Sequence, residues 1–143
     1  MIIDVFSIED IFDLHNRLIE DIGGDYGTYD YTYGRISFII DNLSQSFYGV
    51  ELYPSIFKKS AMLLFFFAKD HCFQDGNKRV AWLTCRMLLA ANGYEILDDG
   101  YDFALLVETV SALKGTEVDT EMIINDISNI LLEHTCYNED LLD

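Results

Sequence analysis

Apolar residues recur at helical spacing along most of this chain. The first stripe begins after Ser7 and ends before a pair of glycines, and its members are Ile8, Ile11, Phe12, Leu14, Leu18, Ile19 and Ile22. Ser7 can accept hydrogen bonds from the first backbone N–H groups of a helix, and Glu9 and Asp10 suit the positive end of the helix dipole. Gly23-Gly24 is a typical helix end. The pattern predicts a helix from Ser7 to about Asp21.

Five further segments continue the helical pattern. We expect them over residues 36–43, from Tyr53-Pro54 through the apolar run that ends at Ala68, and over residues 77–92, 102–113 and 120–133. Pro54 would lie near the first turn of the third helix. That helix is apolar on nearly every face, which is typical of a central buried helix. The sum predicts an all-α bundle, organised as a single domain over residues 1–143, with at most a small β-hairpin.

Four stretches do not fit a helix. Residues 2–6 are apolar and β-prone and could form a short strand, and residues 94–97 could be briefly extended. Tyrosines fall close to alternate positions over residues 26–33, which indicates either a strand or hairpin, or an ordered tyrosine-rich loop packed on the domain. The acidic tail, residues 138–143, is expected to fray.

Composition narrows the functional classes. The formal net charge of -16 would repel nucleic acid, so no direct nucleic-acid partner is expected. The longest apolar run, Ala61 to Ala68, is too short to cross a bilayer, and no basic segment precedes an apolar one at the N-terminus. Cys72, Cys85 and Cys136 form no CxxC pair, which favours reduced thiols. We therefore expect a cytoplasmic protein without a membrane partner.

The stretch from His71 to Arg79, between the third and fourth predicted helices, gathers the chemistry. His71 could move a proton near neutral pH, and Asp75 could hold Mg²⁺. Gly76 lets the backbone approach a ligand closely, at a helix N-terminus that favours an anion. Lys78 and Arg79 could bind phosphate oxygens. These are the parts that a nucleotide-dependent group transfer needs.

Basic residues are concentrated around this stretch. The chain has only nine Lys and Arg residues, and Lys69, Lys78, Arg79 and Arg86 lie on or beside it. This clustering favours an anion site. The alternative is that these cations balance nearby carboxylates.

The order His-x-Phe-x-Asp-Gly-Asn-Lys-Arg resembles the signature of the Fic/Doc family, and every position of that signature is filled. The resemblance extends to the order of the helices. It implies ATP and Mg²⁺ as cofactors and these roles: His71 as general base, Asp75 as the Mg²⁺ ligand, Gly76 and Asn77 as the anion hole, Lys78 and Arg79 as phosphate ligands, and Phe73 as a buried anchor.

Within the family the chain is similar to the death-on-curing branch. Lys78 stands where the AMP-transferring branch usually has Gly, and Trp82 where many of its members have a second Arg. The branch implies a toxin that transfers the γ-phosphoryl group of ATP to a Ser/Thr hydroxyl of a protein such as elongation factor Tu, and a partner antitoxin that silences it. The alternative enzymatic activity is AMP transfer to a protein. The alternative to an enzyme is a non-catalytic member of the fold that acts only by binding. Arg86 could partly replace the missing Arg, although a salt bridge is favoured.

Three other features carry weaker expectations. The family has a flap that aligns its target by strand addition, and residues 26–33 occupy its place without its usual sequence. His15 could reach the site, but a structural or surface histidine is favoured. Residues 135–139 match the spacing of a family inhibitory motif; we interpret the match as chance, with self-inhibition by the tail as the alternative.

Overall fold

The computed structural model describes residues 6–44, 46–115 and 119–142, so the strand expected over residues 2–6 lies outside the described residues except for Phe6. The helices are α1 (Ile8–Ile22), α2 (Thr32–Asn42), α3 (Ile56–Lys69), α4 (Asn77–Ala91), α5 (Phe103–Ser111) and α6 (Thr120–Glu133). The short elements are β1 (Ser46–Phe47), β2 (Val50–Glu51), β3 (Tyr94–Ile96), β4 (Thr135–Tyr137) and the 3₁₀ helix η1 (Glu139–Leu142). The predicted all-α fold is confirmed.

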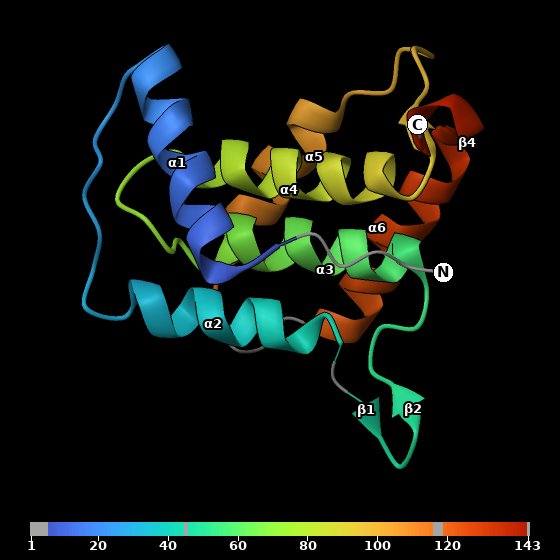
Figure 1. The fold of residues 1–143 in the computed structure, drawn as a ribbon, viewed down its shortest axis with the longest axis horizontal. Coiled ribbons are helices and arrows are strands. Elements are labelled where there is room, and N and C mark those ends of the chain that lie inside the picture. The colour runs from blue at the N-terminus through green and yellow to red at the C-terminus, as the bar shows by residue number, and fades with distance from the viewer. Residues whose placement is uncertain (1–5, 45, 116–118, 143) are drawn as a thin grey trace.

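Helix α3 forms the centre of the bundle, as its apolar sequence predicted. It lies alongside α4 across the middle of the molecule, with α1 in front of the left-hand ends of these helices, α2 below them, and α5 and α6 behind (Figure 1). Buried residues occupy ten of the 14 positions of α3, including Leu63, Leu64 and Phe65. Lys59 is also buried, and its ammonium group donates to the Leu43 carbonyl and lies 3.5 Å from a carboxylate oxygen of Glu51. These partners compensate the charge that the core would otherwise leave unpaired.

Side-chain caps explain where several helices begin. Ser7 and Asp10 form a reciprocal capping box at the start of α1. Asp119 accepts a hydrogen bond from the Met122 N–H, and α6 spans the predicted residues. Ser55 caps α3 by accepting from the Lys58 N–H at 3.0 Å, so the helix begins at Ile56 rather than at the predicted Tyr53-Pro54. That correction is one of position only, because the proline still lies at the helix entrance.

Residues 138–142 of the C-terminal tail are structured, so the prediction that they fray was wrong. The predicted extended segment is β3, and it pairs antiparallel with β4, with Glu95 opposite Cys136. The Asn138 N–H then donates to the Gly93 carbonyl at 2.6 Å, and the Asn138 side chain donates to Glu95 at 2.9 Å. Because these bonds fasten the chain to the end of α4, residues 139–142 continue as η1 instead of fraying.

Of the two interpretations left open for the tyrosine-rich segment, the loop is correct and the strand or hairpin is wrong, since residues 26–31 form a loop that leads into α2. The chain leaves α1 and runs to Thr32, where α2 begins four residues earlier than predicted. The Thr32 hydroxyl accepts a hydrogen bond from the Tyr29 N–H at 2.8 Å and thereby closes the turn before the helix. The hairpin of the fold is instead β1–β2, which projects from the bundle between α2 and α3 (Figure 1).

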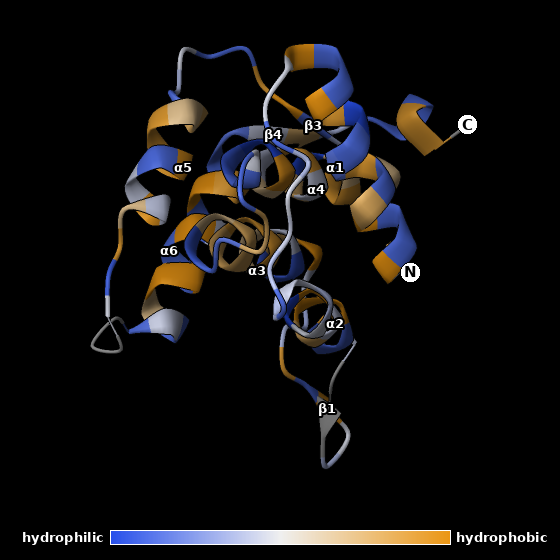
Figure 2. Cartoon of the chain, turned by 90° about the vertical axis from the view of Figure 1, so that its left-hand side faces the viewer, coloured by the Kyte–Doolittle hydropathy of each residue, from blue (hydrophilic) through white to orange (hydrophobic). Residues whose placement is uncertain are grey.

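Figure 2 views the molecule from the end at which two loops meet, one joining α1 to α2 and the other joining α3 to α4. The second loop carries the signature. Among the described residues, no helix is both long and apolar enough to cross a bilayer.

Candidate active site

The signature loop, residues 70–77, leaves the end of α3 through a left-handed residue. His71 has φ of +48°, a conformation that residues other than glycine adopt infrequently. Its carbonyl accepts a hydrogen bond from the Tyr31 hydroxyl at 3.0 Å. The side chain of His71 is exposed, and its ring makes no hydrogen bond within the described residues. The backbone is therefore held while the imidazole is free to meet a ligand.

Phe73 lies at the buried centre of the signature loop and is 1% exposed. Its ring stacks on His15 with a centroid distance of 3.7 Å and an interplanar angle of 5°. The edge contact with Phe12, at 5.8 Å and 88°, closes the other side. Both partners lie on α1, so this helix fixes the middle of the loop.

Asn77, the first residue of α4, closes a ring of hydrogen bonds with the backbone of Phe73. The side-chain oxygen of Asn77 accepts from the Phe73 N–H at 2.9 Å, and its amide group donates to the Phe73 carbonyl at 2.8 Å. The buried backbone groups of Phe73 would otherwise lack these partners. Asn77 therefore sets the shape of the turn that enters α4.

The tyrosine-rich loop fastens the signature loop from the outside. Its Gly27 carbonyl accepts from the Gln74 N–H at 3.1 Å, and Thr28 and Phe73 form an isolated antiparallel bridge. The Thr32 hydroxyl donates to the Cys72 carbonyl at 2.5 Å. The two loops thus share main-chain contacts, although the strand-like pairing is confined to one bridge.

The carboxylate of Asp75 is oriented by backbone donors. One oxygen accepts from the Gly76 N–H at 2.9 Å, and the other accepts from the Asp25 N–H at 3.2 Å. Each carboxylate oxygen has a further lone pair. Gly24 allows this approach, because a Cβ at Gly24 would lie 2.4 Å from the second oxygen. The side chain remains exposed, so a ligand can reach it.

A magnesium ion fits this carboxylate only together with other oxygen donors. Among the described residues, no group of three or more His, Cys, Asp or Glu side chains could hold a metal ion. Mg²⁺ is commonly bound by one or two carboxylates, with waters and substrate phosphates completing its octahedron. Asp75 therefore suits an ion that arrives with a nucleotide rather than one held by the protein alone.

The start of α4 offers an anion site beside Asp75. Gly76 precedes the helix with φ of +84°, a left-handed conformation that glycine adopts without strain. The first N–H groups of the helix follow it, and they favour an anion. Arg79 is exposed and makes no ion pair within the described part of the chain.

Lys78 pairs with an acid, which agrees with the alternative that the cations around the signature balance nearby carboxylates. Its ammonium group lies 2.7 Å from a carboxylate oxygen of Glu108 on α5. The side chains are 52% and 63% exposed, so this is a surface ion pair worth at most about 1 kcal/mol. A phosphate could therefore compete for Lys78.

A cavity of about 270 Å³ adjoins the start of α4. It is lined by Lys78, Arg79, Trp82, Ala104, Val107 and Glu108. Trp82 stacks on Phe103 of α5 at 4.7 Å and 27°, so the position that holds a second Arg in many AMP-transferring relatives here packs one helix on another. Helix α4 contributes Lys78, Arg79 and Trp82 to this lining, and α5 contributes Ala104, Val107 and Glu108, so the cavity offers both cations and apolar side chains to a ligand.

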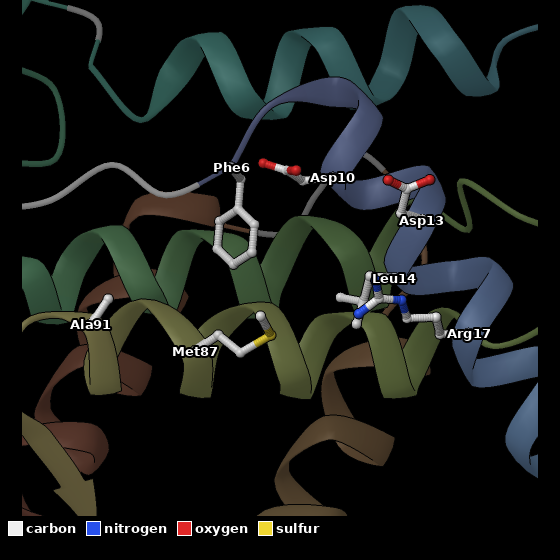
Figure 3. A pocket seen from close by; sticks show the side chains of 7 residues that line it. All are labelled: Phe6, Asp10, Asp13, Leu14, Arg17, Met87 and Ala91. Atoms are coloured by element: carbon white, nitrogen blue, oxygen red, sulfur yellow. The ribbon is translucent and has the colours of Figure 1, made fainter. Parts of the chain in front are cut away.

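A larger cavity of about 410 Å³ lies between α1 and α4 (Figure 3). Its lining contains Phe6, Asp10, Asp13, Leu14, Arg17, Met87 and Ala91. None of these residues belongs to the signature loop. The larger cavity is therefore separate from the candidate active site.

The C-terminal residues lie at the other end of α4. Asn138 bonds to Gly93, two residues after the end of that helix, whereas the signature precedes it. A helix of 15 residues is about 22 Å long at 1.5 Å per residue. The geometry favours chance as the origin of the partial inhibitory motif at residues 135–139.

Sequence reasoning found the signature but missed several residues that hold it. Tyr31, Thr32 and Gln74 were not predicted to bond across the two loops, and for His15 a structural or surface position was favoured over one that reaches the site. His15 is buried and structural, and it contacts the signature directly. Arg86, considered as a substitute phosphate ligand, is exposed on α4. The local sequence carries little signal for partners 40 to 60 positions away.

The fold and this loop define a helical protein in which a histidine and a carboxylate are presented at the N-terminus of a central helix. Comparison with known proteins identifies the class. A family model described as "Fic/DOC family" matches residues 5–89, which is more than half of the chain. The chain therefore belongs to the Fic/DOC family.

Two curated relatives indicate which branch of the family the chain resembles. "Toxin Doc" of Mycolicibacterium smegmatis is 28% identical over 106 residues, which cover 74% of this chain and 79% of the relative. "Protein kinase doc" of Escherichia phage P1 is 34% identical over 92 residues, covering 64% of this chain and 71% of the relative. The family resemblance seen in the signature is confirmed, and these relatives are of the Doc type.

Proposed function

We propose that this protein is a Doc-like toxin that transfers the γ-phosphoryl group of ATP to a Ser/Thr hydroxyl of a protein target in the cytoplasm. The observation that carries the proposal is the position of Lys78 in the first turn of α4, directly after the loop that holds His71 and Asp75. The names of the two relatives, a toxin and a protein kinase, support it. A translation factor such as elongation factor Tu is the expected target by family resemblance.

His71 would take the proton of the target hydroxyl. Its exposed ring has no hydrogen-bond partner among the described residues, and its backbone is fixed through Tyr31. A base held in this way can meet an incoming hydroxyl without first breaking an internal bond. Asp75 would hold Mg²⁺, which neutralises charge on the phosphates when bound.

The first turn of α4 would bind the phosphates that are not transferred. Backbone N–H groups after Gly76 and the guanidinium of Arg79 offer donors to phosphate oxygens. In-line displacement needs the attacking oxygen, the phosphorus and the leaving oxygen nearly collinear. The pose of the nucleotide therefore decides which phosphorus lies beside His71.

Lys78 favours attack on the terminal phosphate. A glycine at this position would leave room at the helix start for the α and β phosphates, whereas a lysine adds both bulk and a cation. Glu108 draws the ammonium group towards α5, beside the cavity of about 270 Å³. The nucleotide would then place its inner phosphates against Lys78 and Arg79 and its γ-phosphoryl group beside His71.

Labelling with α- and γ-labelled ATP, side by side, tests this assignment. Purified protein, Mg²⁺ and either elongation factor Tu or a bacterial lysate would be used, with wild type, His71→Ala and Lys78→Gly compared. We expect γ label on protein with wild type, none with His71→Ala, and less with Lys78→Gly. Lys58→Gly, in the first turn of α3, controls for glycine at a helix start.

Two results would contradict the proposal. Incorporation of the α label by wild type would favour AMP transfer. This is the second candidate function, and it is supported by the signature positions that the chain shares with the AMP-transferring branch. Absence of Mg²⁺-dependent labelling with either nucleotide would favour a non-catalytic binding member of the fold.

Toxicity and its control form a separate part of the proposal. By analogy with the toxin relative, a separate antitoxin would silence the protein, since residues 135–139 lie at the far end of α4. Expression of wild type alone should slow bacterial growth, and His71→Ala at equal protein level should not. Equal growth of the two strains would exclude toxicity that depends on His71.

A further inference from the structure

His15 is a buried imidazole for which the proposed reaction has no use. It lies on α1, is 1% exposed, and its Nε2 is 2.7 Å from the carbonyl oxygen of Asp75. A carbonyl oxygen can only accept, so Nε2 carries the proton in this bond. A buried polar side chain thus donates its hydrogen bond to the backbone of Asp75, the residue proposed to hold Mg²⁺.

The peptide unit between Asp75 and Gly76 couples the hydrogen bond of His15 to the orientation of the Asp75 carboxylate. A trans peptide is planar, and its C=O and N–H groups point in opposite directions. The carbonyl side faces His15 on α1. The N–H side is that of Gly76, and it donates to a carboxylate oxygen of Asp75 at 2.9 Å. Rotation of this peptide would break both hydrogen bonds together.

Packing fixes the ring that holds the peptide. His15 stacks on Phe73 almost face to face, with 3.7 Å between centroids. A Cβ at Gly76 would lie 3.4 Å from Cδ2 of His15, so the ring also lies against the start of α4. The ring therefore contacts both ends of the short segment that carries Asp75.

We propose that His15 is a positioning residue for the Asp75 carboxylate, acting through its Nε2–H bond to the Asp75 carbonyl. The inference rests on the proposed function in one respect, namely that Asp75 holds the Mg²⁺ of a bound nucleotide. It adds that the orientation of this carboxylate, and of the first N–H groups of α4, depends on a donor from α1.

Two variants separate the donor from the bulk of the side chain. His15→Gln keeps an N–H donor at similar reach, whereas His15→Met has nearly the same shape as glutamine and no donor. Both lose the flat ring, so both lose the stacking on Phe73 alike. A purely structural role predicts that the two variants behave equally.

Binding of a non-hydrolysable ATP analogue, with and without Mg²⁺, provides a readout that needs no turnover. Titration calorimetry of wild type should show tighter binding with Mg²⁺. We expect His15→Met to lose about tenfold in affinity for the Mg²⁺-loaded analogue, and His15→Gln to stay within about threefold of wild type. Affinity for the metal-free analogue should change less than about twofold in both variants.

The outcomes distinguish this inference from the proposed function. If wild type binds the Mg²⁺-loaded analogue and the two variants weaken it equally or not at all, the positioning role is wrong and the proposed function stands. If wild type does not bind the analogue, the proposed function fails and this inference with it.

A measurement on wild type alone covers the case in which a variant does not fold. Long-range ¹H–¹⁵N NMR spectra report which ring nitrogen of a histidine carries hydrogen. Nε2 of His15 should be protonated in the folded protein, whether or not nucleotide is present. A ring protonated only at Nδ1 would overturn the inference, because that form cannot donate to Asp75.

Discussion

Replacing Asn77 by alanine should separate the shape of the signature loop from the chemistry of its charged residues. The change removes hydrogen bonds of 2.9 and 2.8 Å to the backbone of Phe73, a residue that is 1% exposed. Each bond contributes about 0.5–1.5 kcal/mol, and the buried backbone groups would be left without partners. Alanine in place of asparagine recovers about 0.5 kcal/mol of helix propensity. The net loss should be about 2 kcal/mol.

Urea denaturation followed by circular dichroism at 222 nm measures this loss. A change of about 2 kcal/mol should lower the midpoint at constant m-value, and it should lower the melting temperature by about 6 °C. Asn42→Ala is a matched control, since the Asn42 amide donates a single bond to the Phe38 carbonyl on α2. That control should cost about half as much and leave nucleotide binding unchanged. A loss below about 0.5 kcal/mol for Asn77→Ala would refute the reasoning that this ring of hydrogen bonds holds the loop.

Three further predictions concern the same region. Gly76→Ala and Gly100→Ala should each cost about 1 kcal/mol in urea denaturation, because both glycines have φ of +84°, but only Gly76→Ala should weaken ATP binding; equal binding would argue against an anion site there. Asp75→Asn should abolish the Mg²⁺ dependence of ATP-analogue binding in calorimetry, whereas the neighbouring Asp25→Asn should retain it, and loss in both would implicate the loop rather than the ligand. Burial raises the pKa of the Cys72 thiol to about 12 and also raises that of Cys85, so at pH 8 only the exposed Cys136 should react with Ellman's reagent; three fast thiols would contradict the packing.

Much of the helical framework follows from local sequence. The bounds of α6 and the start of α4 were predicted correctly from local signals: apolar periodicity follows the capping Asp119 in α6, and Gly76 directly precedes α4. The burial of α3 followed from its apolar sequence in the same way. In each case the determining contacts are either local or nonspecific, and a single sequence shows both.

Apart from small shifts in helix ends, the errors occur where the partner is distant in the chain. Nothing near the tail indicates that residues 135–137 pair with residues 94–96, and without that pairing an acidic segment is expected to fray. The tyrosines at alternate positions suggested a strand or hairpin, but within the part of the chain that the structure describes this loop forms one bridge, between Thr28 and Phe73. His15 shows the same limit, because its role depends on a carbonyl 60 positions away.

If the protein transfers a phosphoryl group as proposed, the hydrogen bonds of the signature loop indicate which residues could select the phosphate that is attacked. The carbonyls of His71, Cys72 and Asp75 each accept from a side chain outside the loop, so the loop is shaped before any nucleotide binds. Residues that could distinguish one nucleotide pose from another must therefore be those left exposed at its edge. Lys78 and Arg79 meet that condition, and the ion pair of Lys78 with Glu108 is weak enough to exchange for a phosphate. Substitution of Lys78 should accordingly alter which phosphate is transferred. Loss of its ion pair with Glu108 should lower the free energy of unfolding by at most about 1 kcal/mol. The helix propensity of the new residue adds its own contribution.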